Sequence, residues 1–314
     1  MNNAMSIYLG NELVSPNYFT VTSEMVPPRS WNPSPLVEQA VRARGYVDAV
    51  DLSDNLLAIA RLSPVVGAFF IRQVGMEPIV QINLRDRNRM GIQSDLMGLA
   101  ALGIKNITIL GGYPAKIGTE PNAKEVYDME TMELVRYVRR FVDEGKLFDN
   151  TVMEEAPQMA IGVVENIAGK PVKELIDRLE AKIDAGANFV RTQLVFDIEL
   201  LEEWMEEARR RGLHERSYIM ASILPLRDAD HVDAVLKIPG IAIPENIIKR
   251  IKEANSPDEG TKMVVELIHK LRNIDGIRGI HIRPLGGMDH FVSKIVREAG
   301  LMNRKLEKVA GYVS

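Results

Sequence analysis

The sequence contains no cysteine, which excludes disulfide bonds, thiolate metal sites and cysteine nucleophiles at once. Its five histidines show none of the close spacings that zinc ligands take, so no metal site is expected. Acidic residues outnumber basic ones, and the net charge of −4 disfavours a nucleic-acid partner, because such a partner favours a strongly basic face. These absences point away from metalloproteins and from nucleic-acid-binding proteins.

Long hydrophobic runs are also missing. No segment approaches the roughly 20 apolar residues that span a bilayer, and Pro64 interrupts the most apolar one, at residues 62–71. The first residues lack the basic start and apolar stretch of a signal peptide. We therefore expect a soluble cytoplasmic protein with no membrane contact. With 314 residues, 46% of them apolar, the chain is long enough for one large α/β domain or two smaller ones.

Two polar loops, each following a short apolar strand, mark the expected site. Residues 79–83 and 107–110 are apolar runs typical of buried strands. Between them, apolar residues recur at helical spacing as far as Gly103, which suits the left-handed position that closes a helix. Strands joined in this way are parallel, so the loops after them lie on one face, where ligands bind. We expect the site in the loops that begin at Arg85 and Gly111.

The rest of the chain repeats this alternation. Strands are expected at residues 19–26, 46–52, 79–83, 107–110, 158–164, 188–193, 218–224 and 279–282. Helices are expected at residues 36–43 (with Ser34 as cap), 64–73, 90–102, 129–144, 172–183, 198–210, 229–236, 247–254, 261–271 and 289–299. No linker or change of composition divides the chain.

Three glycines support a parallel arrangement. Gly45, Gly103 and Gly186 each end a helix immediately before an apolar strand. Helix, glycine and strand recurring without hairpin turns imply parallel strands with right-handed crossovers. About eight such strands favour a closed (β/α)8 barrel over an open doubly wound sheet. We expect one barrel domain over residues 1–314, with residues 1–18 as an N-terminal arm.

Several motifs resemble those of the methylenetetrahydrofolate reductase family. They are Glu24-Met25-Val26-Pro27-Pro28, Arg85-Asp86-Arg87-Asn88, the helix QSDLMGLAALGI, the loop Gly112-Tyr113-Pro114-Ala115-Lys116-Ile117-Gly118, and DAGANFVRTQLVFD at residues 184–197. The resemblance runs from about Phe19 to the last strand. It implies a cytoplasmic reductase that passes a hydride from NADH or NADPH to FAD, and then to 5,10-methylenetetrahydrofolate. In that family the nicotinamide and the folate use the same flavin face in turn. This agrees with the absence from the chain of a G-x-G-x-x-G motif for a separate dinucleotide site.

The resemblance assigns the substrate side of the site. Glu24 matches the acid that opens the methylene bridge of the folate. As a carboxyl group beside apolar residues at a strand end, it is expected to have a raised pKa, although pairing with Arg29 is the ordinary alternative. Gln193 matches a glutamine that contacts folate, and Thr192 belongs to the same motif. The glutamine offers the donors and acceptor that a pterin edge needs, or it simply bonds the loop backbone.

The cofactor side is assigned in the same way. Lys182 matches a lysine associated with the flavin diphosphate, and Tyr127 matches an aromatic residue beside the adenosine half. The guanidinium of Arg85 suits a diphosphate or the glutamate tail of folate. Solvated or self-paired positions are the alternatives for the two cations, and packing on the barrel rim is the alternative for Tyr127. Gly112 belongs to the loop on the same side.

Two departures from the family pattern fall on the flavin side. Tyr113 stands where the family has an aspartate facing both flavin and folate, and a neutral phenol cannot supply that negative charge. Gln81 stands where many members have histidine. A second hypothesis is therefore a folate-binding member with weak or no flavin binding, acting as a carrier or beside an electron-transfer partner. A third is an unrelated barrel lyase or isomerase for a phosphorylated substrate. The resemblance also allows a homo-oligomer.

Overall fold

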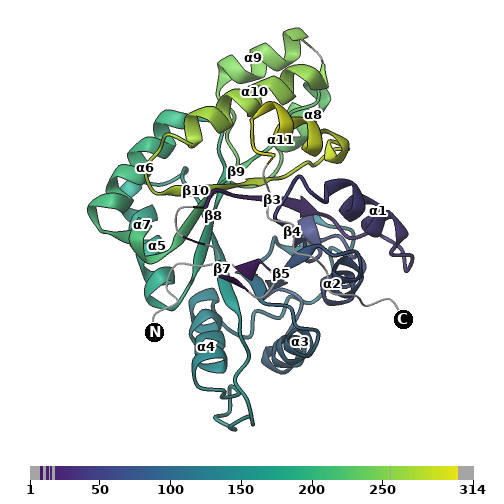
Figure 1. Ribbon diagram of the computed structural model, residues 1–314, viewed down its shortest axis with the longest axis vertical. Coiled ribbons are helices and arrows are strands. Elements are labelled where there is room, and N and C mark those ends of the chain that lie inside the picture. Colours follow the sequence, from purple (N-terminus) through teal and green to yellow (C-terminus); the bar gives the residue numbers. More distant parts are fainter. Residues whose placement is uncertain (1–7, 10–11, 14, 16–17, 255, 303–314) are drawn as a thin grey trace.

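The structure is a computed structural model that describes residues 8–9, 12–13, 15, 18–254 and 256–302. Eight strands form a closed barrel in which each strand pairs in parallel with its neighbours (Figure 1). In chain order they are β3 (Thr20–Met25), β4 (Ala49–Leu52), β5 (Glu77–Asn83), β6 (Asn106–Leu110), β7 (Ala160–Glu165), β8 (Phe189–Leu194), β9 (Tyr218–Ile223) and β10 (Ile277–Ile282). The predicted (β/α)8 barrel is confirmed.

Helices surround the barrel (Figure 1). They are α1 (Ser34–Ala43), α2 (Pro64–Gln73), α3 (Arg89–Ala101), α4 (Thr131–Asp143), α5 (Val172–Asp184), α6 (Ile198–Arg210), α7 (Leu213–Arg216), α8 (Ala229–Val235), α9 (Glu245–Ala254), α10 (Pro257–Leu271) and α11 (Val292–Glu298), with 3-10 turns η1 (Leu56–Ala58), η2 (Ala115–Ile117) and η3 (Asp289–Phe291). The short α7 was not expected. Ser34 is not a cap, since Pro33 takes the cap position and Ser34 begins the helix. Gly45, Gly103 and Gly186 all have positive φ, as helix-ending glycines require.

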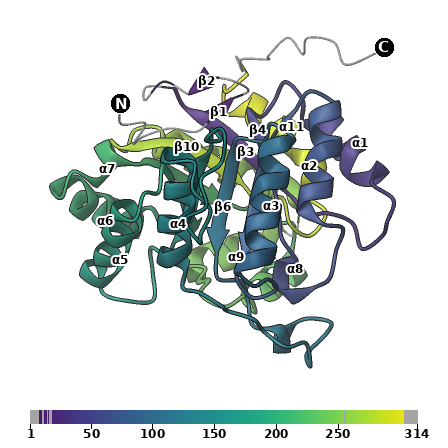
Figure 2. The same ribbon diagram turned by 90° about the horizontal axis from the view of Figure 1, so that it is seen from below.

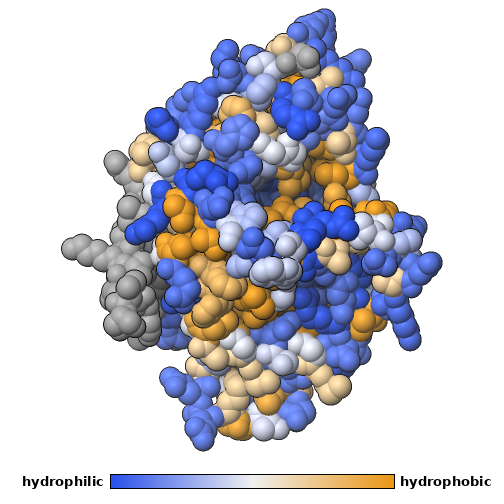
Figure 3. All heavy atoms as spheres, turned by 90° about the vertical axis from the view of Figure 1, so that its right-hand side faces the viewer, coloured by the Kyte–Doolittle hydropathy of each residue, from blue (hydrophilic) through white to orange (hydrophobic). Residues whose placement is uncertain are grey.

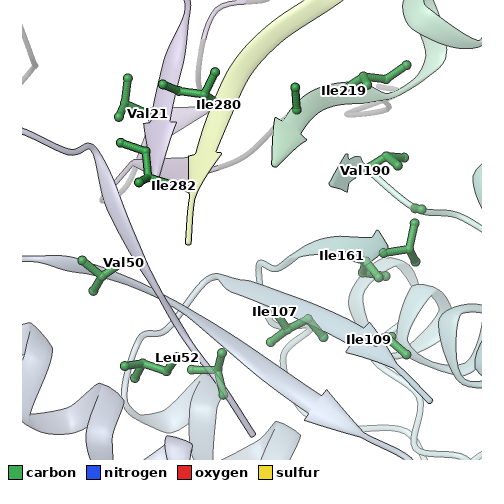
Figure 4. Close-up of a cluster of buried hydrophobic side chains, with 14 of the residues drawn as sticks. Val21, Val50, Leu52, Ile107, Ile109, Ile161, Val190, Ile219, Ile280 and Ile282 are labelled. Carbon is green, nitrogen blue, oxygen red and sulfur yellow. The ribbon is translucent and has the colours of Figure 1, made fainter. Parts of the chain in front are cut away.

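The main hydrophobic core lies between the strands and the helices. Branched aliphatic side chains point outward from the strands at alternate positions, as the period of a strand requires. Val21, Val50, Ile107, Val190 and Ile280 in Figure 4 are all fully buried in this layer. Their alternation leaves the intervening side chains of each strand facing the barrel interior.

The interior is apolar at the end where the strands begin. Here a separate cluster of buried side chains fills the barrel: Tyr8, Ala49, Ile79, Ala160, Phe189, Tyr218 and Met220. Tyr8 belongs to a two-stranded hairpin, β1 (Tyr8–Leu9) and β2 (Glu12–Leu13), which lies at this end in Figure 2. Its backbone N–H donates to Asn106 Oδ1 at 2.8 Å. The hairpin was not predicted within the N-terminal arm, much of which lies outside the described residues, and the extent of the domain stays a prediction.

Gly162 tests how tightly this interior is packed. A Cβ there would lie 2.2 Å from the ring of Phe189, so Gly162→Ala forces a buried aromatic ring to move. We expect the change to lower the free energy of unfolding by about 1–3 kcal/mol. Gly98→Ala is the matched control, because its Cβ meets nothing within 4 Å inside α3, and it should add about 0.5–1 kcal/mol. Urea denaturation of both variants measures the difference, and equal effects would contradict the packing argument.

The outer surface mixes polar and apolar side chains (Figure 3). On the side shown there, α1 and α2 leave Val41, Val66 and Phe69 exposed. None of the helices in the described ranges combines the length and the hydropathy needed to cross a membrane.

Candidate functional site

A cavity of about 590 Å³ opens at the end of the barrel where the strands finish. This is the end towards which the arrow of β6 points in Figure 2, opposite the hairpin. Eight of the nine predicted site residues line it: Glu24, Gln81, Arg85, Gly112, Tyr113, Lys182, Thr192 and Gln193. Tyr127 does not line it. Its backbone N–H donates to Leu84 O at 3.1 Å, its φ is +39°, and its side chain is 42% exposed.

The floor of the cavity carries buried charges in place of the apolar layer below. Inward-facing positions alternate along each strand, so residues two apart share the interior face. Glu24, Asp51 and Arg191 lie on β3, β4 and β8, and all are almost completely buried. His281 of β10 is buried as well, and Arg283 follows that strand. Two carboxylates and two guanidinium groups therefore lie together at the floor of the cavity, and their formal charges balance.

Glu24 is held by two donors. Ser53 Oγ donates to Glu24 Oε1 at 2.8 Å, and Arg283 Nε donates to Glu24 Oε2 at 2.6 Å. The alternative partner considered from the sequence, Arg29, is not involved. Burial raises the pKa of Glu24, but the charge and hydrogen bond of Arg283, the hydrogen bond of Ser53 and the charge of Arg191 together outweigh it, so the net pKa lies below its ordinary value. The expected raised pKa is thus wrong, because the sequence analysis did not foresee the neighbouring arginine.

Arg283 also reaches the predicted folate-binding amide. Its Nη1 donates to Gln193 Oε1 at 3.2 Å, so one guanidinium joins Glu24 to Gln193. Thr192 beside it has a structural contact, since its Oγ1 accepts the backbone N–H of Ser222 at 3.0 Å. The structure therefore brings the two predicted substrate residues together through an arginine that the sequence analysis did not consider.

A second buried group lies next to the first. Asp51 and Glu24 are direct neighbours in the register of β4 and β3. Arg191 Nη1 contacts the Asp51 carboxylate, and Gln81 Nε2 donates to Asp51 Oδ1 at 2.5 Å. Burial, together with the negative charge of Glu24, raises the pKa of Asp51 despite Arg191. Gln81 thus faces the cavity with its amide nitrogen already engaged.

His281 is fixed in one neutral tautomer. Arg191 Nη1 lies 3.1 Å from His281 Nε2 and can only donate, so Nε2 is the acceptor. The proton is then on Nδ1, which lies 2.9 Å from Thr22 Oγ1. Burial and the two nearby arginines lower the pKa of this histidine well below its ordinary value. His281 is therefore a structural member of the floor and carries no charge.

Two cations lie on the side of the cavity where the flavin is expected. Lys182 Nζ donates to Glu165 at 2.6 Å and to Val164 O at 2.7 Å, while Arg178 lies 3.0 Å from the same carboxylate. Both cations line the cavity. Burial lowers the pKa of Lys182, and Glu165 opposes that shift only in part. Arg178 and Glu165 were not predicted, although Arg178 precedes Lys182 by one helical turn on α5.

The loop after β6 is held against the loop after β5. Arg85 Nη1 donates to Tyr113 O at 2.7 Å, while its Nε donates to Asp86 at 2.6 Å. The self-paired alternative for Arg85 therefore describes the structure. Gly112 has φ +86°, which only glycine adopts without strain. A Cβ at Gly111 would meet nothing within 4 Å, so a ligand can approach the backbone there.

Strained backbone also gathers beside the cavity. The backbone φ angles of Asn55, Leu57 and Ala58, just after β4, lie between 44° and 56°. Residues other than glycine rarely adopt such values. Asn55 lines the cavity. No sequence pattern marked this segment. The sequence did contain a signal for the buried charges. Arg191 lies two positions before Gln193 and therefore faces the barrel interior with it, and Asp51 is a charged residue inside an apolar strand.

The fold and the cavity define a (β/α)8-barrel protein with a ligand site at the carboxyl ends of its strands. Residues 11–300 match the family model described as methylenetetrahydrofolate reductase, and the chain belongs to that family. The predicted family is thereby confirmed. Within the described residues, no group of three or more histidine, aspartate or glutamate side chains is arranged to hold a metal ion.

Similar proteins include a "Probable methylenetetrahydrofolate reductase (NADPH)" of Caenorhabditis elegans, 23% identical over 256 residues, which are 79% of this chain and 36% of that protein. "Methylenetetrahydrofolate reductase 1" of Schizosaccharomyces pombe is 26% identical over 220 residues, which are 66% of this chain and 33% of that protein. The chain thus spans about a third of the length of these relatives. A Clostridium thermocellum protein that binds two copies of 5-methyl-5,6,7,8-tetrahydrofolic acid shares the fold, with a TM-score of 0.62, 13% identity, and coverage of 90% of this chain and 94% of that one.

Proposed function

We propose that this chain reduces 5,10-methylenetetrahydrofolate to 5-methyltetrahydrofolate, with a hydride that a bound FAD receives from NADH or NADPH. The observation that carries the proposal is the joint placement of Glu24 and Gln193 on one cavity, linked through Arg283. An acid and an amide side by side suit a substrate whose pterin edge must be held while one of its C–N bonds is opened. Family membership supplies the substrate class.

The reaction requires that the substrate receive one proton and one hydride in the site. Glu24 gives a proton to N10 of the methylene bridge, the bond between N10 and the bridge carbon breaks, and an iminium remains at N5. The flavin, when bound, supplies the hydride that turns this iminium into the methyl group. Gln193 holds the pterin edge, and the walls of the cavity exclude water from the iminium.

The residues of the cofactor side fit a flavin in part. Arg178 and Lys182 place two cations on the cavity wall, and the open backbone at Gly111 leaves room for a ligand beside them. The cations would hold the diphosphate. Glu165 opposes this in part, because both cations share its carboxylate and its single negative charge offsets one of their two positive charges. That observation favours the second candidate, a folate-binding protein with weak or no flavin binding that works as a carrier or beside an electron-transfer partner.

Absorbance in the flavin bands separates the two candidates. The purified protein is measured as isolated and again after FAD is added and unbound FAD removed. Retained flavin that NADH or NADPH bleaches, followed by formation of 5-methyltetrahydrofolate, supports the reductase. A colourless protein that stays colourless with FAD but binds 5,10-methylenetetrahydrofolate supports the second candidate.

Tyr113→Asp should lower the midpoint potential of the bound flavin. Tyr113 lines the cavity without a negative charge, and a carboxylate there repels the anionic reduced cofactor. We expect a decrease of about 20–60 mV, equivalent to about 1–3 kcal/mol for a two-electron couple. Tyr113→Phe is the matched control, since it removes the hydroxyl and leaves the charge alone. A potentiometric titration in which both variants equal the parent would place Tyr113 away from the flavin.

A further inference from the structure

Arg283 links the two residues on which the proposed reaction depends. Its side chain is 11% exposed and lines the cavity. Its Nε donates to Glu24 Oε2, and its Nη1 donates to Gln193 Oε1. A guanidinium has five N–H donors in a fixed plane and no acceptor, and it never loses its charge in proteins. It can therefore exchange one oxygen partner for another, but it cannot give Glu24 a proton.

The hydrogen bonds that Glu24 accepts conflict with its proposed role as the general acid. A carboxylate that accepts from both Arg283 and Ser53 has no proton to donate, and these contacts outweigh burial, which favours the protonated form. Gln193 Oε1 accepts from Arg283 at 3.2 Å and from the backbone N–H of Leu194 at 3.1 Å, so both of its lone pairs are used, and Arg283 must leave before it can accept an N–H of the pterin edge. Substrate cannot be bound by Gln193 and protonated by Glu24 while Arg283 keeps both of its bonds.

The other charged and titratable groups around Glu24 do not resolve this conflict. Asp51 on β4 is negative when ionised and favours a proton on Glu24, whereas Arg191 on β8 opposes one. His281 on β10 is neutral, and Tyr113 faces Arg283 from the loop after β6. Arg191 fixes Asp51 and His281 through its contacts with both, so Arg283 is the group whose partners a ligand can replace.

We propose that Arg283 is a positioning residue that keeps Glu24 as a carboxylate until substrate binds, and then moves to a ring carbonyl oxygen of the pterin. This inference rests on the proposed function. The exchange frees Gln193 for the adjacent N–H groups of the same edge. It leaves Glu24 buried without its cation, so the carboxylate takes up one proton from solvent. That proton is the one later passed to N10, so the acid is loaded only when substrate is present.

Proton uptake on binding tests this exchange without any turnover. Titration calorimetry with 5,10-methylenetetrahydrofolate, in buffers of different ionisation enthalpy at pH 7 and with no reductant, gives the protons bound per ligand. We expect about one proton for the parent and none for Glu24→Gln. Arg283→Gln should take up less than about a third of a proton, because its Glu24 is already protonated before ligand arrives. Arg283→Lys restores a cation, and it should restore most of the uptake and guard against misfolding.

Arg210→Gln is the matched control, since it removes an arginine from an exposed ion pair with Glu207 and should behave as the parent. Binding by the parent without proton uptake would overturn the exchange and leave the proposed function standing. Full uptake by Arg283→Gln would overturn it as well. Absence of any binding heat in the parent would instead defeat the proposed function and this inference with it.

Discussion

Glu24→Gln is expected to slow the reduction of 5,10-methylenetetrahydrofolate by about two to four orders of magnitude. The amide has nearly the shape of the carboxyl group and can still accept the hydrogen bond of Ser53, so the cavity should stay intact. What it lacks is a proton that it can release to N10. Reduction of bound flavin by NADH or NADPH needs no such proton, and its rate should stay within a few-fold of the parent.

Stopped-flow absorbance measures the two half-reactions separately. Glu38→Gln provides the control, because that glutamate is 70% exposed on α1 and pairs with Arg42, and neither residue lines the cavity. Its replacement should change neither rate. A Glu24 variant that still reduces folate within a few-fold of the parent would show that another group is the acid. Asp51 is then the next candidate, since it is the neighbouring buried carboxyl group and has a raised pKa.

The fold could be predicted because its signals are local. Each strand is a short apolar run, each helix has an apolar stripe, and Gly45, Gly103 and Gly186 mark the ends of helices through their left-handed backbone. The end of the barrel that carries the site follows from parallel strands alone. That is why Glu24 and Gln193, 169 positions apart in the chain, could be expected on one face.

The pairing of side chains across the barrel could not be predicted in this way. Arg283 meets Glu24 from the opposite end of the chain, and the register that joins β10 to β3 is set by closure of the whole barrel. Such contacts, with Arg283 first among them and Ser53 and Arg191 adding to it, reverse the pKa shift that burial alone would give Glu24. The contact between Glu165 and Lys182 could not be predicted either, and the negative charge of Glu165 reduces the attraction of Lys182 for an anionic ligand. Residue types indicate which chemistry is present, but the sign of each shift depends on partners that only the fold supplies.

The pair of Asp51 and Arg191 should be the most costly ion pair to break. Both side chains are almost completely buried, so Asp51→Ala leaves a buried guanidinium without the carboxylate that it contacts. We expect the free energy of unfolding to fall by about 3–5 kcal/mol. Asp184→Ala is the control, because it removes a carboxylate from an ion pair with Arg216 in which both partners are about half exposed, and it should cost less than about 1 kcal/mol.

Replacing both members of the buried pair separates stability from function. Asp51→Leu combined with Arg191→Met fills the same region with apolar side chains, and the free energy of unfolding should return close to that of the parent or exceed it. Reduction of folate should nevertheless fall, because Gln81 loses the carboxylate that holds its amide and His281 loses the donor that fixes its tautomer. Urea denaturation and initial rates on the same three variants give both quantities. A double variant that is stable and fully active would show that these buried charges have no part in the reaction.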